Sequence, residues 1–487
     1  MLTRTQGLWL LAAAALALRV VTVGVLWTPM DRPTAYEHGR IAENILSGKG
    51  FSIEFLGTEG PTSQQAPFYP YLLAAVYWLL GVGSPQAIWM VQLLQCLVGT
   101  GLVLAVVGLS WNLAPERRAV GWWAGAMAAV FPIHLYAVTH LQVAIWAAAG
   151  LTALLGLCVY PKTAGTTLGA GLAGGLAGGL LLVDPILLLA WPVALLLFWQ
   201  AERRRHPPSR WRPSGWRTGL MTLVGLAVIS PWTIRNWQVH GELIFIKDTF
   251  GYAFWQGNNP WSFGTDKIPT AWAEEALRQH DGTWAGQNRA LWEARHRTLY
   301  IDDLLLKPTG YREFQGLSEP QRSRLLGRRA WEFVRTQPEQ YGRLVFRRLW
   351  YFLLWDQTNP KASHPLYRIT SLLWLVGAAV GWITTWPSRR QFWPTWLLVF
   401  LFTAFHSLVI TSARFRIPVE PIGMVWAAYA IEKGRTCLAH FLRPSTRSTP
   451  DQMASKRLSQ NCIFLPGCTD QRAAPRLPKT LRKRHFG

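Results

Sequence analysis

Carboxylates gather in one stretch of the chain, between residues 29 and 66. Its acids are Asp31, Glu37, Glu43, Glu54 and Glu59. Asp31 and Glu37 follow closely on an apolar run near the N-terminus, so both are expected beside a membrane surface. A carboxylate in that place can accept a proton from a hydroxyl nucleophile. The alternative for each of these acids is a solvated loop position with no catalytic role.

The composition indicates that the elements positioning these acids are membrane helices. Of the 487 residues, 50% are hydrophobic and only 15% are charged, whereas soluble proteins carry roughly 25% charged residues. An apolar run of about 18 residues or more can cross a bilayer as a helix. Ten spans are predicted, near residues 7–28, 87–111, 119–136, 141–160, 165–183, 185–200, 218–234, 367–386, 392–411 and 417–432. The net charge of +23 would otherwise suggest nucleic acid, but the apolar runs favour membrane lipids as partners instead.

Two helices are predicted in the first outer loop. An amphipathic helix is expected from Ala35 to Ser47, ending at Gly48. Residues 67–83 are apolar but short, and they are rich in proline and aromatic side chains. We therefore expect a helix that lies in the membrane interface rather than one that spans the bilayer.

The distribution of basic residues predicts the sidedness of the protein. With a cytoplasmic N-terminus, the cytoplasmic segments hold 23 of the 49 Lys and Arg residues. Their only acids are Glu116, Glu202, Asp451 and Asp470. We therefore predict a multi-pass protein of the cell inner membrane, with both termini cytoplasmic and the active site extracytoplasmic.

Four parts follow from this layout. Residues 1–234 form an N-terminal transmembrane module that includes the first outer loop, 29–83. Residues 235–366 mix acids and bases in near balance, which is typical of a folded, water-facing domain. Apolar residues at three- and four-residue spacing predict that its segments near 269–300 and 317–355 are helical. The last two parts are C-terminal transmembrane helices and a basic tail expected to be disordered, residues 367–432 and 433–487.

A run of small residues, LGAGLAGGLAGGL at 168–180, lies in one predicted span. Small residues allow two membrane helices to approach closely. A phosphate-binding glycine loop is the alternative, but no GxxxxGK[ST] pattern or flanking strand accompanies the run. The run therefore predicts close helix packing.

Three stretches together resemble GT-C membrane glycosyltransferases of the protein O-mannosyltransferase and aminoarabinose-transferase type. The first is YEHGRIAENILSGKGFS followed by GPTSQQAPFYPYLLAAVYWLLG, at residues 36–52 and 60–81. The second is SPWTIRNWQVHGELIFIKDTFGYAFWQGNNP, at 230–260, and the third is TSARFRIPVEP, at 411–421. The resemblance implies an all-α, GT-C-like bundle of about ten transmembrane helices. It further implies juxtamembrane helices in the first outer loop and a helical extracytoplasmic loop domain.

The resemblance implies an enzyme that moves a sugar from a polyprenyl-phosphate-linked donor to an acceptor on the outer face, with inversion. The acceptor can be a protein, a lipid or a glycan. On this pattern the catalytic base is Glu37, with Asp31 as the second choice. A polytopic transporter of a small or lipid-linked solute, or a lipid-linked glycan ligase or polymerase, stays open as an alternative.

Four basic residues at the outer ends of spans are candidates to hold the donor phosphate: Arg235, Lys247, Arg414 and Arg416. Guanidinium groups bind phosphate through paired hydrogen bonds. Anchoring of lipid head groups is the alternative for Arg414 and Arg416. Asn236, Gln256 and Asn258 are candidates to contact sugar hydroxyls, and turn formation explains Asn258 nearly as well.

Asp184 is a further candidate, because an ionisable residue at membrane depth is often functional. Capping of the helix that follows Pro185 is the equally weighted alternative. The stretch HLYAVTHLQVAIWAAAG, at 134–150, holds no carboxylate, although many members of the resembled group carry an acid there. No metal-ligand spacing is present, so no cofactor is assigned and a divalent cation is left open.

Overall fold

The computed structural model describes residues 3–26, 35–206 and 215–441. Asp31 and most of the basic tail therefore lie outside the described residues. The chain divides into two units, Met1–Gly434 and Arg435–Gly487. The elements below belong to the first unit, apart from the end of the last helix.

The chain is an all-α polytopic protein, and a helix lies over each of the ten predicted spans. These helices are α1 (Arg4–Leu26), α4 (Pro85–Leu113), α5 (Ala119–Val130) with α6 (Pro132–Ala137), α7 (Ala144–Val159), α8 (Thr167–Val183), η1 (Pro185–Ala190) with α9 (Trp191–Arg205), α10 (Trp216–His240), α17 (Pro365–Thr385), η5 (Trp386–Ser388) with α18 (Arg389–Leu408), and α19 (Glu420–Phe441). Three of these spans are each built from two helices, and in each pair one helix has a proline at its first or second position: Pro132 in α6, Pro192 in α9 and Pro387 in η5.

Five stretches of the described chain are long and apolar enough to cross a bilayer. They are α1, α4, η1 with α9, α10, and the continuous run Pro365–Leu408 that contains α17 and α18. The helices α5, α7 and α8 are apolar but shorter. Buried side chains from these helices form one large hydrophobic cluster.

The two segments that were predicted to face outward, called the outer segments here, add further elements. The first contains α2 (Tyr36–Leu46), the strands β1 (Ser52–Phe55) and β2 (Thr58–Pro61), and α3 (Phe68–Leu80). The second contains α11 (Phe250–Gly257), β3 (Lys267–Ile268), α12 (Ala271–Arg278), α13 (Trp284–His296), β4 (Leu299–Tyr300), α14 (Ile301–Leu305), η2 (Lys307–Thr309), η3 (Arg312–Phe314), α15 (Glu319–Thr336), α16 (Pro338–Leu353) and η4 (Pro360–Ser363). A last short helix, η6 (Ala413–Arg416), precedes α19.

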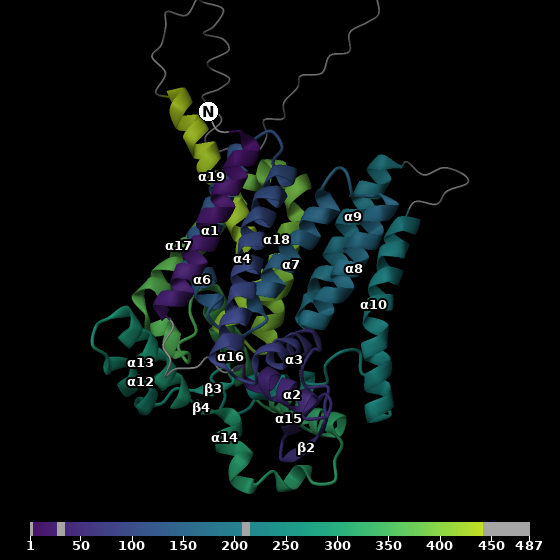
Figure 1. The fold of residues 1–487 in the computed structure, drawn as a ribbon, viewed down its shortest axis with the longest axis vertical. Coiled ribbons are helices and arrows are strands. Elements are labelled where there is room, and N and C mark those ends of the chain that lie inside the picture. Colours follow the sequence, from purple (N-terminus) through teal and green to yellow (C-terminus); the bar gives the residue numbers. More distant parts are fainter. Residues whose placement is uncertain (1–2, 27–34, 207–214, 442–487) are drawn as a thin grey trace, which may run out of the picture. The chain divides into compact units, whose positions relative to one another are not determined.

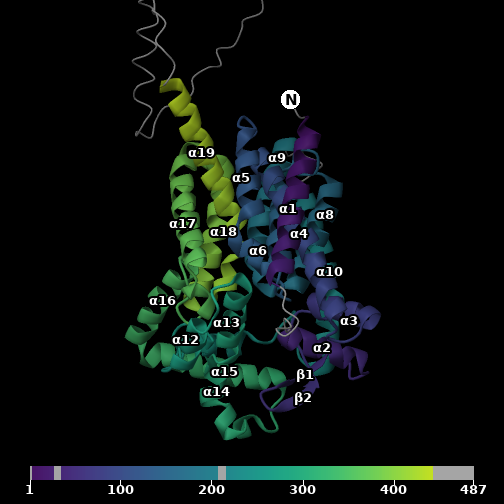
Figure 2. The ribbon, with the colours of Figure 1, turned by 60° about the vertical axis from the view of Figure 1, so that its left-hand side comes forward.

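These outer elements lie together at one end of the long helices. Figures 1 and 2 both show α2, α3 and the β1–β2 hairpin at the same end as α12 to α15. The prediction of a helix from Ala35 to Ser47 is confirmed by α2. At 13 residues, α3 is too short to span a bilayer. The hairpin, an antiparallel pair with Ser52 opposite Pro61, has no counterpart among the sequence predictions.

Candidate functional site

Glu37 lies in the first turn of α2 and is exposed. The helix is fixed behind it, because Ala42 packs with Tyr69 and Leu73 of α3 in a buried cluster. The side-chain amide of Asn44 donates to the Ser52 carbonyl at 2.9 Å and ties α2 to the hairpin. The structure therefore presents an accessible carboxylate on a packed helix, which suits a general base.

Lys247 lies within electrostatic range of three other predicted site residues. Burial lowers the pKa of the Lys247 ammonium, Asp184 and Glu37 raise it, and Arg414 lowers it. The Nζ of Lys247 donates to Oε1 of Gln65 at 3.1 Å. We call Glu37, Asp184, Lys247 and Arg414 the central cluster. Its members come from α2, the α8–η1 junction, the loop after α10 and η6, so folding joins sites that are far apart in sequence.

Arg414 influences several groups around the central cluster. Its side chain is exposed, and its charge lowers the pKa of Lys247 and Lys361. Burial first, and then Lys247 and Arg414, lower the pKa of His38 to about 3, so this imidazole is neutral near pH 7. An accessible guanidinium whose charge acts on several neighbouring groups is suited to bind an anionic ligand.

Asp184 also performs the capping role that was its alternative interpretation. Its carboxylate accepts a hydrogen bond from the Ile186 amide at 3.3 Å at the start of η1. A capping contact engages one carboxylate oxygen. Capping and electrostatic contact with Lys247 therefore coexist in this residue.

Arg416 is 2% exposed and fully engaged inside the protein. Its Nε donates to Glu420 Oε1 at 2.8 Å, and Glu420 Oε2 lies 3.1 Å from Nε2 of the buried His134. Its NH1 donates to the Leu353 carbonyl at 2.6 Å, and its NH2 donates to the Ser371 hydroxyl at 2.8 Å. Because carbonyls at a helix C-terminus lack intrahelical partners, Arg416 caps α16. This environment gives Arg416 a structural role, distinct from the accessible Arg414.

Arg235 and Asn236 hold the first outer loop against α10. Arg235 donates to the Thr62 carbonyl at 2.6 Å and to the Phe51 carbonyl at 3.0 Å. The buried Asn236 accepts from the Ser63 hydroxyl at 2.8 Å and donates to the Ile246 carbonyl at 3.1 Å. Both side chains are therefore engaged by groups of the protein itself, and they position the segment between α2 and α3.

Gln256 and Asn258 lie in and just after α11. Gln256 Nε2 donates to Asp302 Oδ1 at 3.2 Å. The buried Asn258 donates to the Phe254 carbonyl at 2.8 Å and to the Val409 carbonyl at 2.9 Å. Asn258 thus joins α11 to the segment before η6, in line with the turn-forming alternative for this residue.

Lys361 is a candidate site residue that was not predicted from the sequence. Its Nζ lies 2.5 Å from Nε2 of His140, and 4.9 Å from the ring centroid of Tyr136. Burial lowers the pKa of Lys361 strongly, and Arg295 and Arg414 lower it further. Lys361 lies just before the predicted span 367–386. Arg235 was selected because it is a basic residue at the predicted outer end of a span, and the same criterion would also have selected Lys361.

The contact between Tyr252 and Asp302, beside the central cluster, was also not predicted from the sequence. The Tyr252 hydroxyl donates to Asp302 Oδ2. Burial raises the pKa of the Asp302 carboxyl to about 6. Burial also raises the pKa of Tyr252, with smaller contributions from Asp302 and Glu37. No motif or periodicity marks this pair, because α11 and α14 meet only in the folded chain.

The described residues include no group of three or more His, Cys, Asp and Glu that could hold a metal ion. Glu37 and Asp184 both act on Lys247, a competing cation, rather than forming a set of carboxylates around one point. Asp31, the other carboxylate predicted near Glu37, lies outside the described residues, and we derive no step through a divalent cation.

No protein-family model and no curated protein matches the chain. Among solved structures, the chain matches the Archaeoglobus fulgidus oligosaccharyltransferase, solved in complex with Zn and sulfate, at 13% identity and a TM-score of 0.49. That match covers 89% of this chain and 49% of the other, so this chain spans about half the length of the oligosaccharyltransferase.

The chain also matches ArnT from Cupriavidus metallidurans in two states. The apo structure gives 17% identity and a TM-score of 0.36, over 88% of this chain and 77% of ArnT. The structure bound to undecaprenyl phosphate gives 16% identity and 0.39, over 89% and 79%. The solved structures that this chain resembles are thus GT-C fold glycosyltransferases. Because each TM-score lies below 0.5, the function of this chain has to be inferred from its own residues.

Proposed function

We propose that the protein is an integral membrane glycosyltransferase. It moves a sugar from a polyprenyl-phosphate-linked donor to an acceptor on the extracytoplasmic face, with inversion at the anomeric carbon. The observation that carries the proposal is the central cluster, in which the exposed carboxylate Glu37 lies within electrostatic range of Lys247, and Lys247 within range of Arg414. A base and two cations are what displacement of a phosphate by a hydroxyl requires.

In the proposed reaction, Glu37 accepts the proton of the acceptor hydroxyl. The hydroxyl oxygen forms a bond to the anomeric carbon of the donor sugar while the bond from that carbon to the phosphate oxygen breaks. The electron pair of the broken bond stays on the phosphate, which leaves as polyprenyl phosphate. Lys247 and Arg414 stabilise the charge that develops on this leaving group. Asp31 stays the second choice for the base.

The surroundings support these roles. Neutral His38 adds no positive charge next to Glu37, so its carboxylate is not tied up by a neighbouring imidazolium. Asp184 raises the pKa of Lys247 and thereby helps to keep the ammonium charged despite burial. Lys247 and Arg414 would attract an anionic donor to the central cluster, where Glu37 supplies the base.

The test replaces Glu37 by Gln and measures release of polyprenyl phosphate from a polyprenyl-phosphate sugar in proteoliposomes. Extracts of a deletion strain supply the acceptors, and mass spectrometry identifies the product. Loss of a general base is expected to lower the rate by about 10²- to 10⁴-fold. Glu43→Gln is the matched control, because Glu43 lies on the same helix and pairs with Arg40 at the surface, at 3.0 Å.

Wild-type rates in the Glu37→Gln variant would overturn the assignment of the base. Solute flux across sealed vesicles without any glycosylated product would overturn the enzyme proposal and favour a transporter.

A further inference from the structure

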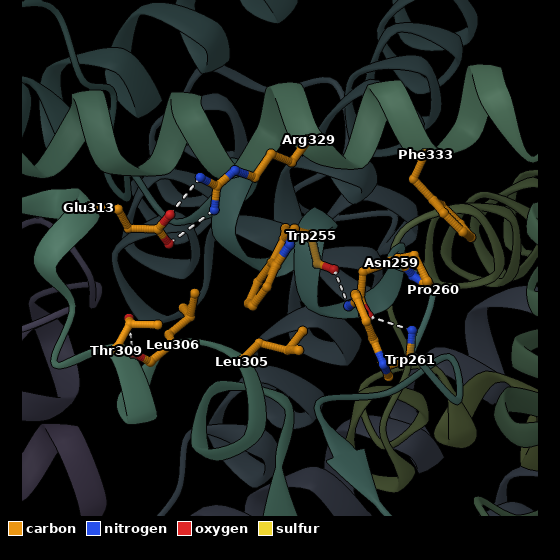
Figure 3. Close-up of a pocket in the computed structure, with 10 residues that line it drawn as sticks. All are labelled: Trp255, Asn259, Pro260, Trp261, Leu305, Leu306, Thr309, Glu313, Arg329 and Phe333. Carbon is orange, nitrogen blue, oxygen red and sulfur yellow. Dashed lines mark hydrogen bonds and ion pairs between the residues drawn. The ribbon is translucent and has the colours of Figure 1, made fainter.

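A pocket of about 280 Å³ lies in the outer loop domain, apart from the central cluster. Figure 3 shows its lining, which is contributed by α11 and the turn after it, the α14–η2 segment, η3 and α15. The lining residues are Trp255, Asn259, Pro260, Trp261, Leu305, Leu306, Thr309, Glu313, Arg329 and Phe333. Ligand pockets for drug-sized molecules range from about 300 to 1,000 Å³, so this pocket fits a small ligand, such as a single ring.

Aromatic side chains form one part of the lining. Trp255 is 5% exposed and Trp261 is 55% exposed, so the second presents an open ring at the surface. Asn259 fixes the turn between them, because its Nδ2 donates to the Trp255 carbonyl at 2.9 Å and its Oδ1 accepts from the Trp261 amide at 3.0 Å. The backbone positions from which the two rings project are therefore fixed before any ligand arrives, which lowers the entropic cost of binding.

A charged pair forms the polar part of the lining. Arg329 donates to both carboxylate oxygens of Glu313, at 3.0 and 2.6 Å. Figure 3 shows this pair on one side of Trp255 and Trp261 on the other. A guanidinium has five N–H donors and a carboxylate about four acceptor sites. The pair therefore keeps both donors and acceptors for a ligand, while its charges cancel.

These features select the class of ligand. Flat aromatic rings pack against the C–H faces of a sugar ring, and a neutral donor–acceptor pair can bond to sugar hydroxyls, which both donate and accept. An anionic ligand would approach the carboxylate of Glu313, and a lipid tail would leave the polar pair without partners. A neutral pyranose satisfies both parts of the lining.

The pocket shares its elements with the contacts beside the central cluster. Helix α11 carries Trp255 in the pocket and also Tyr252 and Gln256, which both donate to Asp302. Asp302 belongs to α14, which also contributes Leu305 to the pocket. Tyr252 in turn lies within electrostatic range of Glu37. A ligand in the pocket would therefore be held by α11 and α14, and α11 also carries Tyr252, on which the charge of Glu37 acts.

We propose that this pocket binds one neutral sugar ring of a carbohydrate acceptor. The inference rests on the proposed function, because only that function makes the bound molecule an acceptor. It narrows the class of acceptor from a protein, lipid or glycan to a molecule that carries a neutral pyranose. Binding of the sugar ring by the pocket does not itself require transfer, so the two proposals can fail separately.

The test measures binding of methyl β-glycopyranosides of glucose, galactose, mannose and N-acetylglucosamine to the full-length protein in detergent by saturation-transfer NMR. At least one glycoside is expected to bind saturably. Trp261→Ala and Arg329→Met are each expected to weaken that binding by about tenfold, which corresponds to the loss of one aromatic or charge-assisted contact.

Matched controls lie in the outer elements. Trp272→Ala removes another exposed tryptophan, 73% accessible on α12. Arg324→Met breaks another two-bond pair, in which Arg324 contacts Glu242 at 2.5 and 3.1 Å. Neither control is expected to change glycoside binding, and Glu37→Gln is expected to leave it unchanged as well. Absence of saturable binding to the wild-type protein, or equal losses in the controls, would overturn the pocket proposal. Glycoside binding without any transfer activity would leave the pocket proposal standing and overturn the proposed function.

Discussion

Arg414 and Arg416 are separated by one residue, yet their environments are opposite. Both lie in η6, a 3₁₀-helix, in which three residues make one turn. Residues two positions apart therefore point in directions about 120° from each other. Arg414 is exposed near the central cluster, whereas Arg416 is buried against Glu420 and the end of α16. The RFR sequence supplies one accessible cation and one internal cap.

This difference predicts two distinct phenotypes. Arg416→Met is expected to destabilise the fold strongly, because removing one partner of a buried ion pair typically costs about 3–5 kcal/mol. Arg414→Met is expected to melt like the wild type but to need a higher donor concentration, because it removes a proposed phosphate contact. Thermal melting in detergent and the KM for the polyprenyl-phosphate sugar measure the two effects. Equal melting temperatures for the two variants would contradict the structural assignment of Arg416.

At the scale of elements, α8 and α10 pack so closely that no Cβ atom fits at two glycines of α8. A Cβ atom built on Gly174 would lie 2.4 Å from the Met221 carbonyl oxygen, and one on Gly178 would lie 2.5 Å from the Gly225 carbonyl oxygen. Both are clashes with backbone, which cannot move aside as a side chain can. The small-residue run therefore packs closely against a neighbouring helix, which confirms that prediction.

The next glycine along the run provides a matched comparison. A Cβ on Gly179 would meet nothing within 4 Å. Gly178→Ala is expected to separate α8 from α10 and lower the melting temperature, whereas Gly179→Ala is expected to be neutral or slightly stabilising, because alanine favours a helix by about 1 kcal/mol over glycine. Melting of the two variants in parallel tests this, and equal destabilisation would contradict the packing seen at Gly178.

The elements that the sequence predicts well are those with a local signal. Apolar length marks the spans, and amphipathic spacing followed by Gly48 marks α2, whose bounds differ from the prediction by one residue at each end. The β1–β2 hairpin carries a weaker signal because its position depends on distant partners. Arg235 of α10 donates to the Phe51 carbonyl, and Arg322 of α15 donates to the Phe55 carbonyl at 2.7 Å.

Among the site residues as well, a local signal in the sequence separates those that can be predicted from those that cannot. A basic residue at the outer end of a span is recognisable from sequence, but its exposure is not, so Arg414 and Arg416 could not be told apart. The Tyr252–Asp302 contact and the pairing of Lys361 with His140 could not be predicted either, because each depends on how the outer domain packs onto the helices.

At the scale of the whole molecule, the orientation of the protein in the membrane is still a prediction. It can be tested directly by cysteine labelling. Glu59 is exposed in the β1–β2 hairpin and Glu116 is exposed in the α4–α5 loop, with α4 between the two positions. In a cysteine-free background, Glu59→Cys is expected to react with a membrane-impermeant maleimide on intact spheroplasts. Glu116→Cys is expected to react only after permeabilisation, because the positive-inside rule places it in the cytoplasm. The reverse labelling pattern would contradict the orientation.

The contacts of Arg416 also have a consequence for the order in which the protein is made. The Leu353 carbonyl, Ser371 and His134 are all synthesised before Arg416 and Glu420, which complete their hydrogen bonds. Until the ribosome reaches that point, the end of α16 lacks its cap and His134 lacks its buried carboxylate. Residues 235–366 and nine of the ten predicted spans are therefore synthesised before the segment that supplies these partners. A chain that stops before Arg416 would leave the Leu353 carbonyl and His134 without these hydrogen-bond partners.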